Sequence, residues 1–317
     1  MGYSGCGAGQ KGISLDLLKK LLGTQRALMA WLWASLICNM GIVVTGGIVR
    51  LTGSGLGCSD WPYCTPDRLT PHPELGIHGL IEFGNRTLTG VLCFVALGAW
   101  IAAWWVRGRG TKLWWVTFAV GWGIVAQAII GGITVKVGLN PFIVGFHLTA
   151  SIPLIVLCTW GVLLGREAVP AATSTGTRAL IVGTFCAAMV SVATGTLTTG
   201  AGPHAGDANA PRNGLNIEQI ARLHALSAWV VAILAVACVV VCKRAANREA
   251  TRLATMFLAA VALQGAIGYL QYFLGIPASV VWMHMAGLTV FAAASAWLLF
   301  GTKGASYAWR KWHIMRR

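Results

Sequence analysis

Charged residues are scarce in this chain: Asp, Glu, Lys and Arg together make up 10% of 317 residues, and only nine residues are acidic. A soluble domain of this length carries about a quarter charged residues, so the composition excludes an ordinary water-soluble protein. The strict alternation of apolar and polar residues that marks a membrane β-barrel is also lacking. Apolar residues instead make up 56% of the chain. The composition therefore indicates a helical membrane protein.

The apolar residues fall into blocks of about 20 or more, which is the length that a helix needs to cross a bilayer. We expect eight spans, at 28–49, 78–104, 114–135, 141–164, 179–199, 219–242, 253–274 and 278–300. The first block is too long for a removable signal peptide and lacks its small-residue cleavage site. The expected fold class is an all-α integral membrane protein.

Positive charge is distributed unevenly between the two sides of this topology, although the net charge is +15. One side keeps only Arg50, Arg68, Lys136 and Arg212 outside the spans, and most other Lys and Arg residues fall on the opposite side. This asymmetry follows the positive-inside rule and predicts a cell-membrane protein with both termini in the cytoplasm. The basic balance orients the chain, so we expect no nucleic-acid partner.

The two halves of the chain repeat each other. A Gln-Gly-His series occurs twice, 137 positions apart, as Gln127, Gly131, His147 and Gln264, Gly268, His284. In addition, "IEFGNRTLTG" (81–90) lines up with "IARLHALSAW" (220–229), which sets Asn85 against His224. Because both halves start on the same side of the membrane, the repeats would be parallel, related by an axis along the membrane normal.

The repeat predicts two pseudo-symmetric four-helix bundles, at 28–164 and 179–300. A cytoplasmic N-terminal segment (1–27), a cytoplasmic linker (165–178) and a basic cytoplasmic tail (301–317) would complete the chain.

Four of the seven histidines lie within the expected spans, on alternate helices and near their outer ends: His78, His147, His224 and His284. A lone membrane histidine is usually a helix–helix hydrogen-bonding residue. Four at one depth favour a cofactor site, because facing helices of a bundle are where such sites are built. Two imidazoles about 10 Å below the surface can hold a flat iron porphyrin from both faces. Zinc or copper is less expected, since no carboxylate or thiolate joins each pair.

Glu82 is the only acidic residue well inside an apolar block. An ionisable residue in a membrane is a functional candidate by default, and a carboxylate near a ligand position can transfer protons. The alternative is a structural ion pair with Arg86, one helical turn further on.

Cys58 and Cys64 share one outer loop, on the side of the membrane where disulfides survive. We expect a short loop disulfide, with free thiols as the alternative. No second pair of ligands accompanies them, so a structural zinc site is not expected.

Several of these segments together resemble heme A synthase, the membrane enzyme of cytochrome oxidase assembly. They are "GGIVRLTGSGLGCSDWPYC" (46–64), "IEFGNR" (81–86), the Gln-to-His blocks 127–147 and 264–284, and "TGTLTTGAGPHAGD" (194–207). The resemblance covers about residues 25–300. It implies an oxidoreductase that oxidises the methyl group on carbon 8 of heme O to a formyl group, giving heme A. It further implies two successive hydroxylations, the second giving a hydrated aldehyde that loses water.

The resemblance also assigns residues. It implies that His224 and His284 hold the iron of a heme b cofactor in the C-terminal half, and that His147 ligates the substrate heme in the N-terminal half. Glu82 maps onto the family's second-span glutamate, and Cys58 and Cys64 map onto its outer-loop cysteine pair.

One position departs from the family pattern. Many members carry a histidine three residues after the glutamate, where this chain has Asn85, a poor iron ligand. His78 is on the same helix face but about 10 Å further out. His78 could replace the missing ligand only if the substrate heme sits higher or the helix start bends. We hypothesise instead that His147 binds the substrate iron alone in at least one state and leaves the opposite position open for oxygen, with His78, Glu82 and Asn85 forming a polar wall on that side. A merely structural role for His78 at the helix start is the alternative.

Arg86 and Arg222 lie near outer helix ends and are candidates to pair with heme propionates, with interfacial snorkelling as the plain alternative. Two other functions compete with heme A synthesis: a non-catalytic di-heme membrane cytochrome that passes electrons from quinol, and a heme-handling chaperone. A pure electron carrier needs two complete histidine pairs, whereas Asn85 breaks one of them. The expected partners are heme O, the heme O synthase that supplies it, membrane lipid and an electron donor; a homo-oligomer is left open.

Overall fold

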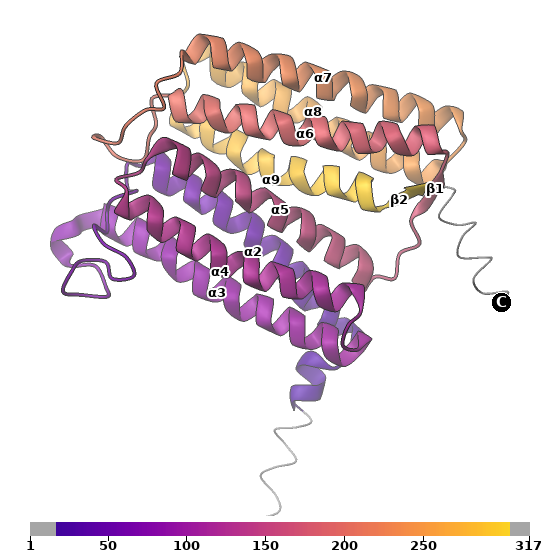
Figure 1. The fold of residues 1–317 in the computed structure, drawn as a ribbon, viewed down its shortest axis with the longest axis horizontal. Coiled ribbons are helices and arrows are strands. Elements are labelled where there is room, and N and C mark those ends of the chain that lie inside the picture. Colours follow the sequence, from indigo (N-terminus) through magenta and orange to yellow (C-terminus); the bar gives the residue numbers. More distant parts are fainter. Residues whose placement is uncertain (1–16, 305–317) are drawn as a thin grey trace, which may run out of the picture.

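Eight long helices run side by side in the computed structural model, which describes residues 17–304 (Figure 1). They are α2 (Gln25–Leu51), α3 (Gly76–Arg107), α4 (Lys112–Lys136), α5 (Pro141–Gly165), α6 (Thr175–Ala201), α7 (Ile217–Arg244), α8 (Arg248–Phe273) and α9 (Ala278–Phe300). Each is long and apolar enough to cross a membrane. The predicted all-α fold with eight spans is therefore confirmed. Most of the predicted N-terminal segment 1–27 and of the tail 301–317 lies outside the described residues.

Several helices begin at a loop residue whose side chain caps the first turn. The Thr24 hydroxyl accepts the N–H of Ala27 at the start of α2, and the Asn247 side chain accepts the N–H of Ala250 at the start of α8. Such caps satisfy backbone donors that the first helical turn leaves free. Because Asn247 caps it, α8 begins at Arg248, about one turn before the apolar block predicted from residue 253.

The helices form two groups of four. Helices α2, α3, α4 and α5 contact one another in a closed cycle, as do α6, α7, α8 and α9. Helices α2 and α5 contact α9, and α5 also contacts α6, so these four form the boundary between the groups (Figure 1). The pseudo-symmetric relation between the groups stays a prediction.

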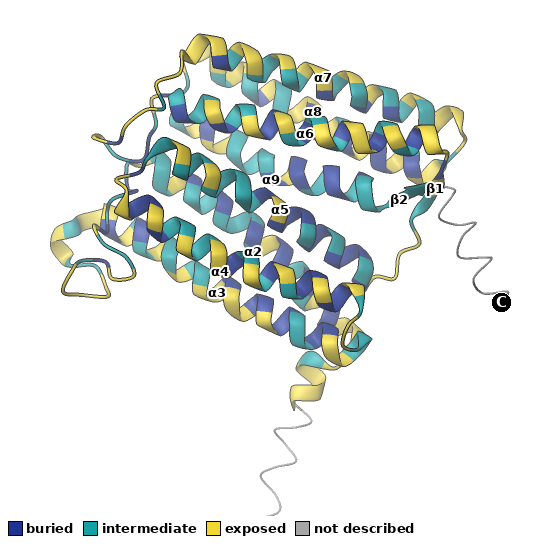
Figure 2. Ribbon diagram, in the orientation of Figure 1, coloured by how far each residue is buried: buried dark blue, intermediate teal, exposed yellow. Residues whose placement is uncertain are grey.

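The exposed surface of the helices is apolar. Large side chains such as Phe94, Trp122 and Ile233 are more than 60% exposed, and exposed residues run along the outward faces of the helices while buried ones face inward (Figure 2). A helix that is apolar on its outer face as well as its inner face suits lipid rather than water.

Two three-residue strands were not predicted. Strand β1 (Ala171–Thr173) pairs in parallel with β2 (Thr302–Gly304), and Arg178 donates to the carbonyl oxygens of Leu299 (2.5 Å) and Thr302 (3.1 Å). Helix α6 also begins at Thr175, inside the stretch predicted as linker. The connection between the two groups is thus tied to the end of α9.

The loops at the end of the helices opposite the β1–β2 strand pair, which we call the outer loops, pack together. Leu139, Ala205 and Ala210 form a small apolar cluster against Leu56. The N–H of Gly55 donates to the carbonyl oxygen of Gly206 at 2.7 Å. A short 3-10 helix, η1 (Pro73–Leu75), leads from the first of these loops into α3. These contacts fix the outer ends of the helices that carry the candidate site.

Candidate functional site

The histidine pair predicted in the C-terminal half lies together in space. The rings of His224 on α7 and His284 on α9 have centroids 6.3 Å apart, with their planes at 83°. Imidazoles that ligate one metal ion from opposite sides each place a nitrogen about 2 Å from it, so their ring centres lie about 6 Å apart. The spacing of this pair therefore fits two axial ligands of one iron.

Hydroxyl groups and glycines shape the surroundings of these rings. The Thr194 hydroxyl is 3.3 Å from Nδ1 of His224. A Cβ atom added at Gly195 would lie 2.9 Å from Cε1 of His224, and one added at Gly268 would lie 3.3 Å from Cε1 of His284. A second-layer partner on Nδ1 fixes a ligating imidazole so that Nε2 faces the metal. The two glycines let the rings approach the backbones of α6 and α8.

Four side-chain atoms of histidine and glutamine residues are buried without a hydrogen-bond partner. They are Nδ1 of His284, Oε1 of Gln264, Nδ1 of His147 and Oε1 of Gln127. Buried polar atoms are nearly always hydrogen-bonded in folded proteins. The same two residue types carry such atoms in both halves.

The donor set fits an iron porphyrin better than a bare metal ion. Among residues 17–304 there is no cluster of three or more His, Cys, Asp or Glu side chains that could hold a metal ion. An iron porphyrin brings four nitrogen ligands of its own and needs only axial ones, such as imidazole. Two facing imidazoles within apolar helices are sufficient for it.

The N-terminal half places His147 in matching surroundings. A Cβ atom added at Gly131 would lie 3.4 Å from Cε1 of His147, as Gly268 lies beside His284. On α3, Asn85 accepts a hydrogen bond of 2.7 Å from the Thr45 hydroxyl of α2. In the other half, the Thr194 hydroxyl of α6 contacts His224 of α7. That Asn85 takes the place which His224 holds in the other half stays a prediction from the sequence repeat.

His78 is anchored at the start of α3. Its Nδ1 is 2.8 Å from the hydroxyl of Ser54, which is completely buried. A Cβ atom added at Gly57 would overlap the carbonyl oxygen of His78. The outer loop therefore packs directly against this end of the helix, an arrangement that suits the structural role left open for His78.

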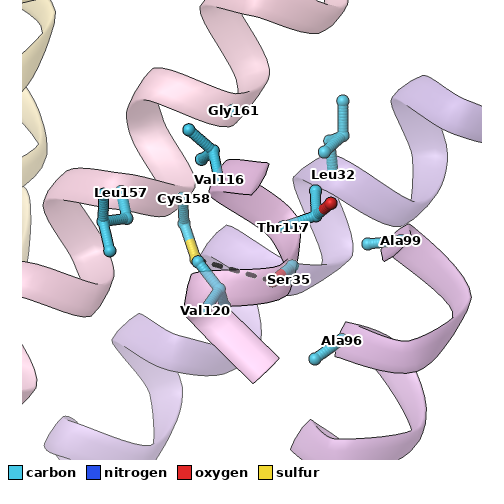
Figure 3. A pocket seen from close by; sticks show the side chains of 10 residues that line it. All are labelled: Leu32, Ser35, Ala96, Ala99, Val116, Thr117, Val120, Leu157, Cys158 and Gly161. Atoms are coloured by element: carbon cyan, nitrogen blue, oxygen red, sulfur yellow. Dashed lines mark hydrogen bonds between the residues drawn. The ribbon is translucent and has the colours of Figure 1, made fainter. Parts of the chain in front are cut away.

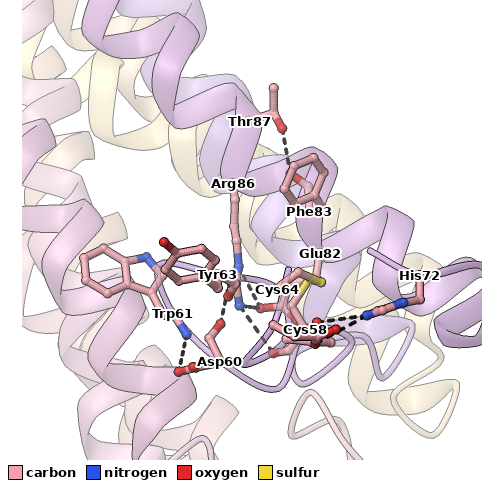
Figure 4. The surroundings of a disulfide bond; sticks show 12 residues. Cys58, Asp60, Trp61, Tyr63, Cys64, His72, Glu82, Phe83, Arg86 and Thr87 are labelled. Carbon is pink, nitrogen blue, oxygen red and sulfur yellow. Dashed lines mark hydrogen bonds and ion pairs between the residues drawn. A yellow bond between two sulfur atoms is a disulfide. The ribbon is translucent and has the colours of Figure 1, made fainter. Parts of the chain in front are cut away.

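Glu82 binds the outer loop rather than standing free. Its Oε2 accepts the N–H of Cys58 at 2.6 Å, and its Oε1 accepts hydrogen bonds from Nε (3.1 Å) and Nη2 of Arg86 (Figure 4). Cys58 and Cys64 form the predicted disulfide. The ion pair between Glu82 and Arg86 is therefore present, and it joins the disulfide loop to α3.

Arg86 has no donor left for a propionate. Besides Glu82, its guanidinium donates to the carbonyl oxygens of Asp60 (2.7 Å), Tyr63 (3.1 Å) and Cys58 (3.3 Å). These contacts use the five N–H groups that a guanidinium carries. We call residues 58–64, held in this way by Glu82 and Arg86, the clasped loop.

The clasped loop also reaches α4. A Cβ atom added at Gly132 would overlap the indole of Trp61, and Lys136 forms an ion pair of 3.0 Å with Asp60. The Trp61 N–H, with a smaller contribution from Lys136, holds the pKa of the Asp60 carboxyl below its ordinary value. Since Gly132 follows Gly131, the loop lies against the part of α4 that borders His147.

Arg222 points away from the histidine pair. It forms an exposed ion pair of 2.5 Å with Glu218. Residues two positions apart on a helix do not share a face, so Arg222 and His224 lie on different sides of α7. The predicted propionate role of Arg222 has no structural support.

The model of the COX15-CtaA family, described as cytochrome oxidase assembly protein, matches residues 29–300. The chain belongs to this family. Similar curated proteins include the heme A synthase of Rhizorhabdus wittichii, which is 24% identical over 86% of this chain and 92% of its own length. The heme A synthases of Lysinibacillus sphaericus and Listeria monocytogenes are both 31% identical. The match to the Lysinibacillus sphaericus protein covers 38% of this chain and 40% of that protein. The match to the Listeria monocytogenes protein covers 40% of this chain and 42% of that protein.

A cavity of about 10 Å³ lies deeper in the N-terminal group, between α2, α3, α4 and α5 (Figure 3). Its lining is mostly apolar, apart from Thr117 and a 3.5 Å contact between Ser35 and Cys158. This volume holds one water molecule at most. It is far too small for a porphyrin, so this cavity is not a heme site.

The sequence analysis assigned Arg50 to one side of the membrane and gave it no functional role. In the structure its Nη2 donates to the carbonyl oxygen of Thr199 at 3.0 Å, while its Nε is buried without a partner. Its place in the "GGIVR" segment was the only signal that could have drawn attention to it.

Proposed function

We propose that this protein is a heme A synthase, a membrane oxidoreductase that converts the methyl group on carbon 8 of heme O to a formyl group. The asymmetry between the halves carries the proposal: a histidine pair with centroids 6.3 Å apart in one half, and Asn85 at the position that the sequence repeat aligns with His224 in the other. Membership of the cytochrome oxidase assembly family and relatives named heme A synthase support it.

The C-terminal half would hold a heme b cofactor. His224 and His284 would hold its iron, and the Thr194 hydroxyl would keep the His224 ring oriented. When bound, this heme supplies one-electron transfer between a reductant and the substrate. With both histidines engaged in holding this heme, the oxidation of substrate would fall to the other half.

The N-terminal half would hold the substrate, heme O. His147 ligates its iron from α5, and Asn85 faces the site as a neutral amide held by Thr45. A neutral amide is a weak iron ligand, which leaves that side of the substrate open for oxygen. A di-heme electron carrier has no use for this open side, and neither has a heme chaperone.

Glu82 enters the proposal in two roles. Its contacts to Cys58 and Arg86 support a positioning role, in which the clasped loop is held over the substrate site. As a catalytic acid or base, the role expected from the sequence, it would have to release Arg86 first. The experiment that opens the Discussion separates these roles.

We further propose that the protein lies in the cell membrane with both termini in the cytoplasm. Heme O would reach it from a heme O synthase, and a separate electron donor would reduce the heme b. The distribution of Lys and Arg supports this orientation.

The proposal is tested by expressing the protein together with a supply of heme O, then extracting the hemes and measuring their masses. The wild type should yield heme A. His147→Ala should keep heme b but yield no heme A, and His284→Ala should lose heme b and heme A together. His72→Ala, in the outer loop, serves as the matched control. A wild type that binds two hemes b and makes no heme A would refute the synthase and favour the electron carrier.

A further inference from the structure

Arg50 lies at the boundary between the two helix groups, and none of the described acidic side chains forms an ion pair with it. It lies in the last turn of α2, where Nη2 donates to the Thr199 carbonyl oxygen and Nε is buried without a partner. Among the described residues, no carboxylate lies within ion-pair distance of it. Arg50 as a residue is only partly buried, but its Nε is shut off from water, and a donor in that state costs free energy unless something pairs with it.

A second cation lies nearby. Arg212 belongs to the loop that packs on Arg50, since a Cβ atom added at Gly206 in that loop would lie 3.9 Å from the Cα atom of Arg50. It donates to the carbonyl oxygens of Ala210 (2.9 Å) and Pro203 (2.5 Å) and also lacks a carboxylate partner. Asp207, in the same loop, accepts the N–H of Asn209 instead. Arg212 is exposed, so water can solvate it. The buried Nε of Arg50 is therefore the group that indicates an anion the chain itself does not supply.

The position of Arg50 relates this site to the C-terminal histidine pair. Gly47 lies one turn deeper on the same face of α2, and a Cβ atom added there would lie 3.2 Å from Sδ of Met285. His284 lies about 1.5 Å outward of Met285 on α9, and Arg50 lies about 4.5 Å outward of Gly47 on α2, so Arg50 lies about 3 Å further out than that histidine. Thr199, which accepts its hydrogen bond, lies five residues, or about 8 Å, outward of the Thr194 that contacts His224. Both measures place the guanidinium on the outer side of the histidine pair.

We propose that Arg50 binds a propionate carboxylate of the heme held by His224 and His284, with Arg212 as the second cation at the outer rim. The inference rests on the proposed function. A guanidinium matches a carboxylate with two parallel hydrogen bonds, and Nε is one of the donors this pairing uses. The two arginines expected from the sequence in this role, Arg86 and Arg222, are engaged elsewhere. Arg50 takes over the role they do not fill.

The test compares a heme that has carboxylates with one that does not. Purified protein with its C-terminal site empty, in detergent, is titrated with heme b and with heme b dimethyl ester, and the dissociation constants and reduction potentials of the bound hemes are measured. The wild type should bind heme b about 10- to 100-fold more tightly than the ester, the usual range for a charge-assisted hydrogen bond. Arg50→Gln should bind both hemes to within about threefold of each other, and its heme b should have a shifted potential. Arg222→Gln, another outer arginine but paired with Glu218, should keep the wild-type preference.

Each result decides a different point. Equal affinity of the wild type for heme b and for its ester would overturn the inference, even if no variant folds. Full discrimination retained in Arg50→Gln would also overturn it. A thermal shift with phosphatidylglycerol vesicles that is lost in Arg50→Gln, without heme discrimination, would assign the site to a lipid phosphate instead. Arg50→Lys, which keeps the charge but not the fork, should lie between the wild type and Arg50→Gln. Failure of the wild type to bind any heme would refute the proposed function itself.

Discussion

Replacing Glu82 by Gln should loosen the clasped loop, and this change separates a positioning role from a chemical one. Gln keeps an oxygen that can accept the N–H of Cys58, but it loses the charge that pairs with Arg86. Glu218→Gln is the matched control, because Glu218 forms the same type of i, i+4 pair with Arg222. The two pairs differ in burial: the side chains of Glu82 and Arg86 are 6% and 19% exposed, whereas those of Glu218 and Arg222 are 61% and 76% exposed.

This difference in burial sets the expected magnitudes. Removing one partner of a fully buried ion pair costs about 3–5 kcal/mol, because the remaining charge stays buried. Arg86 keeps three carbonyl acceptors and is partly exposed, so we expect about 2 kcal/mol for loop opening, which is roughly a 30-fold rise in the open population. An exposed pair contributes only about 0.3–0.5 kcal/mol, so Glu218→Gln should change little.

The assay is the rate at which a water-soluble phosphine reduces the disulfide between Cys58 and Cys64, since both cysteines are buried in the closed loop. Reduction that requires local opening should accelerate in proportion to the open population. We expect a roughly 30-fold increase in Glu82→Gln and less than about threefold in Glu218→Gln. Should Glu82→Gln reduce at the wild-type rate and yet make no heme A, the clasp would be unimportant and Glu82 would act in the chemistry.

Two further predictions follow from the glycines beside the site. Gly195→Ala should displace the His224 ring, because the new Cβ atom would lie 2.9 Å from it; the absorption spectrum of bound heme b should lose its six-coordinate form, whereas Gly183→Ala, which points into open space on the same helix, should leave the spectrum unchanged. Gly132→Ala should push Trp61 off α4 at a cost of about 1–3 kcal/mol, seen as a lower thermal midpoint and faster disulfide reduction. An unaltered midpoint in that variant would show that the clasped loop does not depend on this contact.

The membrane architecture was predictable because it follows from local properties of the chain. The length and apolarity of each block determine whether it can cross a bilayer, and neither depends on distant residues. The helix ends differed from prediction where polar caps such as Asn247 extend a helix beyond its apolar block. The disulfide was also predictable, since Cys58 and Cys64 are six residues apart.

The candidate site was only partly predictable. Periodicity and repetition found His224 and His284, because residues at one depth on facing helices converge. The partners of the charged groups were not predictable. Arg86 was one candidate partner for a propionate, with snorkelling as the equal alternative, and it donates to three loop carbonyls. Arg50, given no role, is the cation left incomplete.

The amino-acid sequence by itself determined which segments cross the membrane, at what depth the histidines lie, and that Asn85 stands where the repeat has a histidine. Only the tertiary structure decided what each polar group contacts: Glu82 reaches the backbone of a residue 24 positions away, and Arg50 reaches one 149 positions away. The physical reason is that hydropathy is a property of one segment and shows whether that segment suits lipid. How closely two helices approach depends instead on the side-chain shapes of both. Hydrogen bonds across such contacts arise from the packing of the whole molecule, so no single segment encodes them.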